Sequence, residues 1–300
     1  MFLSALLIIT VILILLYLLK IYYWSGGSFK SDQRLDGKYV IITGANTGIG
    51  KATATDLVQR GIICGYYKDR TDKKCFLIGL GAHVILACRD RQRAQTAADD
   101  IRNKTGSQNV EIEIVDTSSL ESVKSFAIRI RKKLKHLDIL INNAVAHMEI
   151  QFDDINLEKR YTPLIGYAHS KLANILFTRE LAKRLQGTNI TANSLHPGVI
   201  VTELLRYNEQ RIPPFLYPLY SLLKPLAWFF TKNADQGSQT TIRLAVDKKL
   251  DGVTGKYFSD CVEVATSSQA SDDQAAKRLW EVSEKMTRLK EAENELESKI

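Results

Sequence analysis

A tyrosine and a lysine four residues apart form the most chemically suggestive pair in this sequence of 300 residues. Tyr167 and Lys171 lie in the run Tyr-Ala-His-Ser-Lys, and residues four apart on a helix share one face. An ammonium beside a phenol stabilises the phenolate and lowers the tyrosine pKa, so the hydroxyl can move a proton near neutral pH. Both residue types are common in helices, so chance is the alternative, and the pair gains meaning only from the motifs around it.

A glycine-rich turn supplies the second candidate site. The run 39–42 is apolar and β-branched, as in a buried parallel strand, and residues 51–59 have helical composition. Between them stand Gly44, Gly48 and Gly50, which gives the order of strand, turn and helix that a pyrophosphate site requires. Glycines let backbone N–H groups approach phosphate at a helix N-terminus, where the helix dipole favours anions. A purely structural glycine turn is the alternative.

Charged residues follow the next two predicted strands. Arg89 follows the strand at 84–88, where dinucleotide folds contact the adenosine ribose. An acid at that place favours the free 2′-hydroxyl, whereas an arginine accommodates a 2′-phosphate, so NADP(H) is preferred over NAD(H). A solvated arginine at a strand end is the alternative. Asp116 ends a further strand at 110–115.

These motifs resemble the short-chain dehydrogenase/reductase family, and within it the membrane-anchored retinol dehydrogenases. The resemblance extends to Asn142-Asn143-Ala144 after the strand at 137–141, and to Pro197-Gly198 with Thr202, which is similar to the family's nicotinamide loop. It implies that Tyr167 is the general acid/base and that Lys171 tunes its pKa. It implies NADP(H) contacts from Gly44, Asn46, Thr47, Gly48, Ile49, Gly50, Arg89, Asp116, Asn143, Lys171, Pro197, Gly198 and Thr202.

The sequence departs from the family in two places. Residues 62–81 look inserted, because their removal would join Gly61 to Ala82 in the family's usual strand entry, and we expect a polar surface loop. The family places a helix with an asparagine and a central strand with the catalytic serine before the tyrosine. Only 145–166 are available here for a crossover of about a dozen residues or more, a strand of about five and the loops between them. This segment contains Asp153-Asp154, Pro163 and Gly166, no serine and no uninterrupted apolar strand.

The predicted fold is α/β, a Rossmann-like doubly wound parallel sheet that lacks one helix and one central strand. We assign 1–24 to a transmembrane anchor and its flank, 37–290 to the dehydrogenase domain with the insertion 62–81, and 291–300 to a helical tail. Residues 275–300 are expected to form one charged amphipathic helix. The hydrophobic fraction of 45% and charged fraction of 25% are those of a globular protein, which excludes wholesale disorder.

The charge pattern and the cysteines argue against a nucleic-acid partner, a zinc site and a disulfide framework. The net charge of +8 comes from scattered lysines and arginines rather than blocks, so no nucleic-acid partner is expected. The four cysteines form no C-x-x-C pair and have no accompanying histidine spacing, so neither a zinc site nor a disulfide framework is predicted. A reducing compartment fits best.

The apolar run 2–19 approaches the length of about 20 residues that crosses a bilayer as a helix. A cleavable signal peptide is the alternative, but the run is longer than a signal core of roughly 7–15 residues and has no basic start. Basic residues follow the run and none precedes it, which places the domain in the cytosol. We expect a single-pass protein of the endoplasmic reticulum membrane.

The resemblance implies an NADP(H)-dependent oxidoreductase that interconverts retinal and retinol, or a similar lipophilic carbonyl and alcohol. The partners of such a protein would be a retinoid-like small molecule and, through the N-terminal helix, membrane lipid. A homodimer is also possible. The apolar stretch 213–230 either dips into the bilayer surface beside the substrate or forms a partly buried helix pair.

The missing serine segment favours a second hypothesis, an inactive anchored protein that retains dinucleotide binding. A membrane scaffold is a third hypothesis, supported only by amphipathic helices.

Overall fold

A computed structural model of the chain describes residues 2–21, 25–61, 63–68, 73–78, 81–142, 152–155, 157–159, 161–200 and 231–291, with Phe215, Tyr217, Ser221, Phe229 and Asn294. It describes the backbone alone for 2–9, 13, 63–68, 73–78, 163, 164 and 167. Nearly all of the stretch 213–230, together with Asn143 and Thr202, therefore lies outside the described residues, and the predictions made for them stay predictions.

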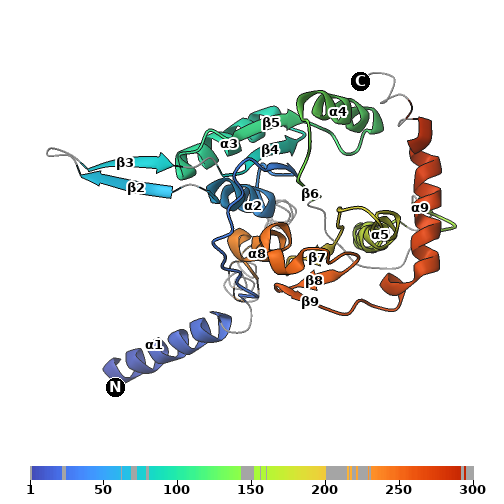
Figure 1. Ribbon diagram of the computed structural model, residues 1–300. Coiled ribbons are helices and arrows are strands. Elements are labelled where there is room, and N and C mark those ends of the chain that lie inside the picture. The colour runs from blue at the N-terminus through green and yellow to red at the C-terminus, as the bar shows by residue number, and fades with distance from the viewer. Residues whose placement is uncertain are drawn as a thin grey trace.

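A four-stranded parallel sheet forms the first half of the domain (Figure 1). Its order is β5-β4-β1-β6, formed by β1 (Tyr39–Thr43), β4 (His83–Cys88), β5 (Val110–Ile114) and β6 (Ile139–Ile141). The residues of β1 and β4 are buried on both faces, as expected for parallel strands that helices cover on either side. The expected α/β fold with a Rossmann-like parallel sheet is confirmed.

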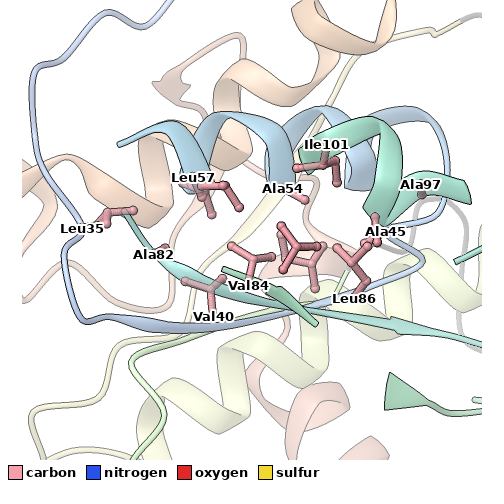
Figure 2. Packing of buried hydrophobic residues seen from close by; sticks show 14 of the residues in the cluster. Leu35, Val40, Ala45, Ala54, Leu57, Ala82, Val84, Leu86, Ala97 and Ile101 are labelled. Atoms are coloured by element: carbon pink, nitrogen blue, oxygen red, sulfur yellow. The ribbon is translucent and has the colours of Figure 1, made fainter. Parts of the chain in front are cut away.

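Side chains that alternate along β1 and β4 enter two hydrophobic clusters. Val40, Ile42, Val84 and Leu86 pack under three helices, α2 (Gly48–Gln59), α3 (Arg91–Thr105) and α8 (Ala234–Val246). Figure 2 shows this sheet cluster, in which Leu57 of α2 and Ile101 of α3 lie over the strands. On the opposite face, Ile41 and Ile85 pack against α4 (Leu120–Lys133). The period of two along each strand therefore divides the core between the two faces.

A smaller sheet forms the second half. β7 (Ser194–His196) pairs in parallel with β8 (Tyr257–Ser259), which turns back into β9 (Val262–Glu263). Short 3-10 helices at Lys248–Leu250 and Gln269–Ser271 come before β8 and after β9 in the sequence.

Two long helices pack together in this half. α5 (Pro163–Arg184) lies against α9 (Asp273–Thr287), with Leu172, Leu176 and Leu279 at the centre of a third hydrophobic cluster, the α5–α9 cluster. α9 ends where Arg288 adopts a left-handed backbone conformation (φ 49°). The helix predicted over 275–300 is therefore interrupted at Arg288, and residues 289–291 are helical again.

The two sheets are separate. β6 ends one of them and β7 begins the other, and no described residue between Asn142 and Thr162 lies in a helix or strand. This division is what the shortage of residues before Tyr167 leads us to expect, because a central strand would have joined the two halves into one sheet.

The insertion forms a β-hairpin rather than the expected loop. β2 (Ile63–Lys68) pairs antiparallel with β3 (Lys73–Ile78), and the hairpin projects away from the parallel sheet (Figure 1). The prediction of a loop was wrong because it rested on the polar centre of the segment, whereas aromatic and β-branched residues before and after that centre favour strands. The residues on either side of the hairpin lie next to each other, since a Cβ placed on Gly61 would lie 2.8 Å from Gly81 N.

The N-terminal run forms the helix α1 (Phe2–Leu19), which extends away from the rest of the molecule (Figure 1). Its described side chains from Val11 to Leu19 are exposed. Counting only the described residues, no helix is long and apolar enough to cross a membrane. The transmembrane span therefore stays a prediction.

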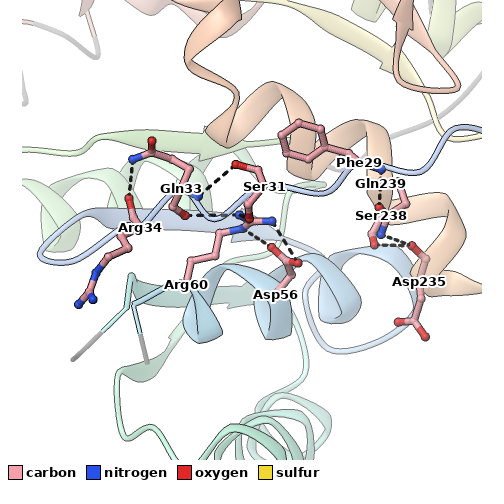
Figure 3. A network of polar contacts seen from close by, with 9 residues as sticks. All are labelled: Phe29, Ser31, Gln33, Arg34, Asp56, Arg60, Asp235, Ser238 and Gln239. Carbon is pink, nitrogen blue, oxygen red and sulfur yellow. Dashed lines mark hydrogen bonds and ion pairs between the residues drawn. The ribbon is translucent and has the colours of Figure 1, made fainter. Parts of the chain in front are cut away.

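The linker after α1 is attached to the domain along α2 and α8 (Figure 3). Arg60 Nη1 donates to the Ser31 carbonyl over 2.9 Å, while the same guanidinium pairs with Asp56. The backbone N–H of Phe29 donates to Gln239 Oε1 over 3.0 Å. Several hydrogen bonds thus fix the path of the linker over the two helices.

Candidate active site

The glycine turn joins β1 to α2 at the carboxyl end of the parallel sheet. Gly44 (φ 64°) and Gly48 (φ 55°) both adopt left-handed backbone conformations, which glycine takes at low cost. A Cβ placed on Gly48 would meet no atom within 4 Å, so the turn faces open space there. Thr47 caps α2 without a side-chain hydrogen bond to its first turn. The N–H groups of that turn are therefore suited to bind an anion.

A buried cysteine supports the turn from the end of β4. The Cys88 side chain is 3% exposed, and backbone N–H groups of Ala45 and Asn46 hydrogen bond to its sulfur. Burial raises the pKa of the Cys88 thiol, and the two N–H groups act in the opposite direction. Cys88 is thus a neutral packing residue beneath the turn, a role that nothing in the sequence pattern indicated.

Arg89 and Asp116 lie at the same edge of the sheet, just past the ends of β4 and β5. Val115 N donates to Cys88 O over 3.0 Å, which continues the pairing of the two strands up to these residues. Asp116 accepts hydrogen bonds from the hydroxyl and backbone N–H of Ser118, and these bonds, with the nearby Arg89 charge, hold the pKa of the Asp116 carboxyl below its usual value. The structure therefore brings Arg89 and Asp116, two of the predicted NADP(H) contacts, together beside the glycine turn.

The turn containing Pro197 and Gly198 also lies near the start of α2. It runs from β7 to Ile200, and Ile200 and Ile49 both pack against Gly237 of α8. A Cβ on Gly237 would collide with Ile200 Cδ1 and would lie 3.5 Å from Ile49 Cγ1. The absence of a side chain at Gly237 thus allows the predicted nicotinamide loop to approach the glycine turn, a contact that sequence reasoning missed.

The predicted catalytic pair lies on α5. Thr162 caps this helix through its hydroxyl, which accepts from Ile165 N over 3.1 Å, and Pro163 occupies the first turn. Tyr167 and Lys171 are one helical turn apart, as expected, although the side chain of Tyr167 lies outside the described residues. Lys171 is half-buried, and burial lowers its pKa to about 8.

The lowered pKa of Lys171 predicts an effect on stability. Because that pKa of about 8 lies below the ordinary 10.5, the folded chain binds fewer protons than the unfolded chain between these values, and the free energy of unfolding should rise with pH across this window. At pH 7, Lys171→Met should stabilise the fold by about 1–2 kcal/mol, after allowance for solvent screening. Denaturant unfolding at pH 7 and pH 10 measures both effects.

The exposed Lys277 on α9 provides the control, because Lys277→Met removes one charge without relieving burial. This variant should keep the wild-type dependence on pH, whereas Lys171→Met should lack the rise between pH 8 and 10.5. An unchanged pH dependence in Lys171→Met would contradict the inference.

Helix α5, which carries the predicted catalytic pair, and the glycine turn belong to different hydrophobic clusters. The residues that pack around Leu172 and Leu176 come from α5, α9 and the segments beside them. None of them belongs to the sheet cluster, which contains Ala45 of the glycine turn. The structure therefore brings together the glycine turn, Arg89, Asp116 and the Pro197–Ile200 turn, while Lys171 lies on a helix whose buried residues form a cluster of their own.

A glycine turn at the carboxyl edge of a parallel sheet, with helices on both faces, defines a dinucleotide-binding α/β protein of the Rossmann type. Residues 75–165 and 158–212 match the family model described as short chain dehydrogenase. Retinol dehydrogenase 12 of Mus musculus is 35% identical over 312 residues, covering 87% of this chain and 90% of that protein. Retinol dehydrogenase 14 of Homo sapiens is 34% identical, covering 85% and 88%. This chain belongs to the short-chain dehydrogenase family and is by family an oxidoreductase.

Solved structures show the same fold at lower identity. L-sorbose reductase from Gluconobacter frateurii, solved with NADPH and L-sorbose, has a TM-score of 0.55 at 19% identity, covering 76% of this chain and 96% of that chain. Hydroxysteroid dehydrogenase from Escherichia coli has a TM-score of 0.52 at 22% identity, with 76% and 96% covered. At these identities the likeness concerns the fold alone.

Proposed function

We propose that the chain is an NADP(H)-dependent oxidoreductase of the retinol dehydrogenase type, acting on retinal and retinol or on a similar lipophilic carbonyl and alcohol. The glycine turn supports the cofactor assignment most strongly, because Gly48 leaves open space at the N-terminus of α2 where a pyrophosphate would bind. The identity to retinol dehydrogenases supports the substrate class.

The residues of the nucleotide end fit this cofactor. N–H groups at the start of α2 would hold the pyrophosphate, and Arg89, which is exposed, would bind a 2′-phosphate. Asp116 would contact the adenine, and Pro197 and Gly198 would border the nicotinamide. A bound nicotinamide supplies or accepts the hydride.

Proton transfer would fall to α5. Tyr167 would give a proton to the carbonyl oxygen during reduction and take it back during oxidation. Lys171, one turn away, would favour the phenolate by its charge. Its pKa of about 8 means that part of this charge is lost in mildly alkaline solution.

A second candidate function is dinucleotide binding without turnover. The separation of the small sheet from the parallel sheet and the packing of α5 outside the sheet cluster favour it, because the helix with the predicted catalytic pair and the glycine turn then pack in different clusters. The serine that binds the substrate oxygen in the family has no counterpart in 145–166. Loss of such a donor costs about 10²–10³ in rate in other enzymes.

One experiment separates the two candidates. The purified chain is tested for NADPH binding and for retinal reduction, with Tyr167→Phe as the matched variant. If the chain is an oxidoreductase, Tyr167→Phe should lower turnover by about two orders of magnitude while NADPH binding stays unchanged. Binding without turnover in the wild-type chain would support the second candidate, and equal turnover in both proteins would contradict the role of Tyr167.

We also propose that α1 anchors the protein in the endoplasmic reticulum membrane with the domain in the cytosol. An α-helix of 18 residues is about 27 Å long, close to the bilayer core of about 30 Å. The exposure of its described side chains supports this placement. The sequons at Asn103 and Asn189 are both exposed, so glycosylation at either would contradict the cytosolic orientation.

A further inference from the structure

A buried lysine lies where the second half of the site meets the linker from α1. Lys232 is 8% exposed, and its backbone N–H donates to Val199 O over 2.8 Å. The same residue forms an isolated parallel bridge with Ile200. Its backbone therefore joins the end of the Pro197–Ile200 turn to the residues that lead into α8.

The side chain of Lys232 passes between two glycines. A Cβ on Gly198 (φ 88°) would lie 2.7 Å from Lys232 Nζ, and a Cβ on Gly26 (φ 72°) would lie 2.6 Å from Lys232 Cε. Neither position can carry a side chain without moving the lysine. The turn and the linker thus contact the same side chain at positions that lack side chains of their own.

The ammonium of Lys232 has a partner on the turn between β8 and β9. It pairs with the Asp260 carboxylate. Asp260 (φ 50°) and Cys261 (φ 64°) form a tight turn with two consecutive left-handed residues, the pattern of a type I′ hairpin turn.

Helix α8 and the linker both hold this turn. Cys261 N donates to Thr240 Oγ1 over 3.1 Å, and Arg243 donates to the Cys261 carbonyl. A Cβ on Gly27 would lie 2.9 Å from Cys261 Cβ, so the linker packs directly against the same turn. Asp260 therefore gives Lys232 a fixed counter-ion.

We propose that Lys232, paired with Asp260, is a positioning residue that fixes the Pro197–Ile200 turn for the nicotinamide end of the cofactor and ties this turn to the linker after α1. The proposal rests on the proposed function, which assigns the turn to the nicotinamide. The adenosine half of the cofactor is held elsewhere, by the glycine turn, Arg89 and Asp116. Loss of the lysine charge should therefore affect one half of the cofactor and spare the other.

Two nucleotides test this difference in the full-length chain purified in detergent. Lys232→Met keeps most of the side-chain length and removes the charge. It should weaken NADPH binding about tenfold by displacing the turn, while 2′,5′-ADP, which lacks the nicotinamide, should bind within about twofold of the wild-type affinity. Asp260→Asn should shift NADPH affinity in the same direction and tests the pair if Lys232→Met does not fold.

Lys256→Met is the matched control, because Lys256 is exposed directly before β8 of the small sheet and pairs with Glu263 of β9 over 2.9 Å. It should change neither affinity. Equal weakening of both nucleotides in Lys232→Met would overturn the proposal in favour of a general structural role, and unchanged affinity for both would overturn it as well.

Hydrogen exchange gives a readout that does not depend on the cofactor. Lys232→Met should speed exchange at the amides of Gly198–Ile200 and of Gly26–Phe29, but not in β1 or β4. Unchanged exchange at both segments would overturn the positioning role. If the wild-type chain binds neither nucleotide, the proposed function fails, and the exchange experiment still decides whether Lys232 joins the turn to the linker.

Discussion

Gly48→Ala should lower the affinity of the chain for NADPH by about 100-fold. Gly48 has a φ of 55° at the N-terminus of α2, and the space beside its Cα is open. An added methyl group would occupy the space through which the phosphates approach the N–H groups, and it would strain the turn by about 1–2 kcal/mol. Both effects oppose binding. Titration of NADPH and of 2′,5′-ADP measures the loss, which should be similar for both ligands.

Gly187→Ala provides a control for strain alone. Gly187 follows α5 with a φ of 83°, and a Cβ there would also meet no atom within 4 Å. The two variants should lose comparable stability in thermal unfolding, whereas only Gly48→Ala should lose nucleotide affinity. Equal affinity in both variants would remove the glycine turn from the cofactor site.

Deletion of residues 62–80 should leave a folded domain that binds NADPH with unchanged affinity. The deletion joins Gly61 to Gly81, whose backbone atoms already lie close together. The hairpin β2–β3 extends away from the sheet, so its loss exposes little of the core (Figure 1). The folded full-length chain bears the entropic cost of closing a long loop, and the deletion removes this cost. The free energy of unfolding should therefore rise by about 2–3 kcal/mol. Denaturant unfolding and NADPH titration of the full-length and shortened chains test both statements.

A Gly/Ser segment of equal length in place of 62–80 separates the contribution of the hairpin from that of loop length. If the hairpin makes no stabilising contacts with the domain, this chain should unfold at the same denaturant concentration as the wild-type chain. An insoluble or unfolded deletion variant, beside a folded Gly/Ser variant, would show that the direct junction of Gly61 and Gly81 is strained and would contradict the prediction.

Much of the fold was predictable because local patterns and packing agree. The runs at 39–42 and 84–88 are apolar, the run at 110–115 alternates apolar and acidic residues, and each forms a strand of the parallel sheet. The start of α4 is harder to derive from the sequence. Ser118 and Glu121 have the spacing of a capping box, but the cap is Ser119, which accepts from Ser122 N over 3.2 Å. Several residues with hydroxyl side chains precede α4, and the backbone conformation decides which of them caps the helix.

The site could be predicted only where its residues lie close together in the sequence. Strand, glycine turn and helix follow one another directly, so Gly44 to Gly50 could be placed from the pattern. The half-buried state of Lys171 could not, because burial of a side chain depends on tertiary packing and not on the local pattern of residues. Likewise, Lys232 reads as a surface lysine in the sequence, since Gly26, Gly198 and Asp260 come from three distant segments.

Strand β6 has a consequence for the life of this protein in the cell. Within the described part of the chain it pairs only with β1, and Leu140 on it is 55% exposed. An open strand edge with an apolar side chain resembles the surface that other chains pair with when proteins aggregate. Chaperones and proteases act on such surfaces, and they alter steady-state protein levels several-fold for small differences in stability. The exposed Leu140 on β6 is therefore the kind of surface at which chaperones and proteases would act on this chain.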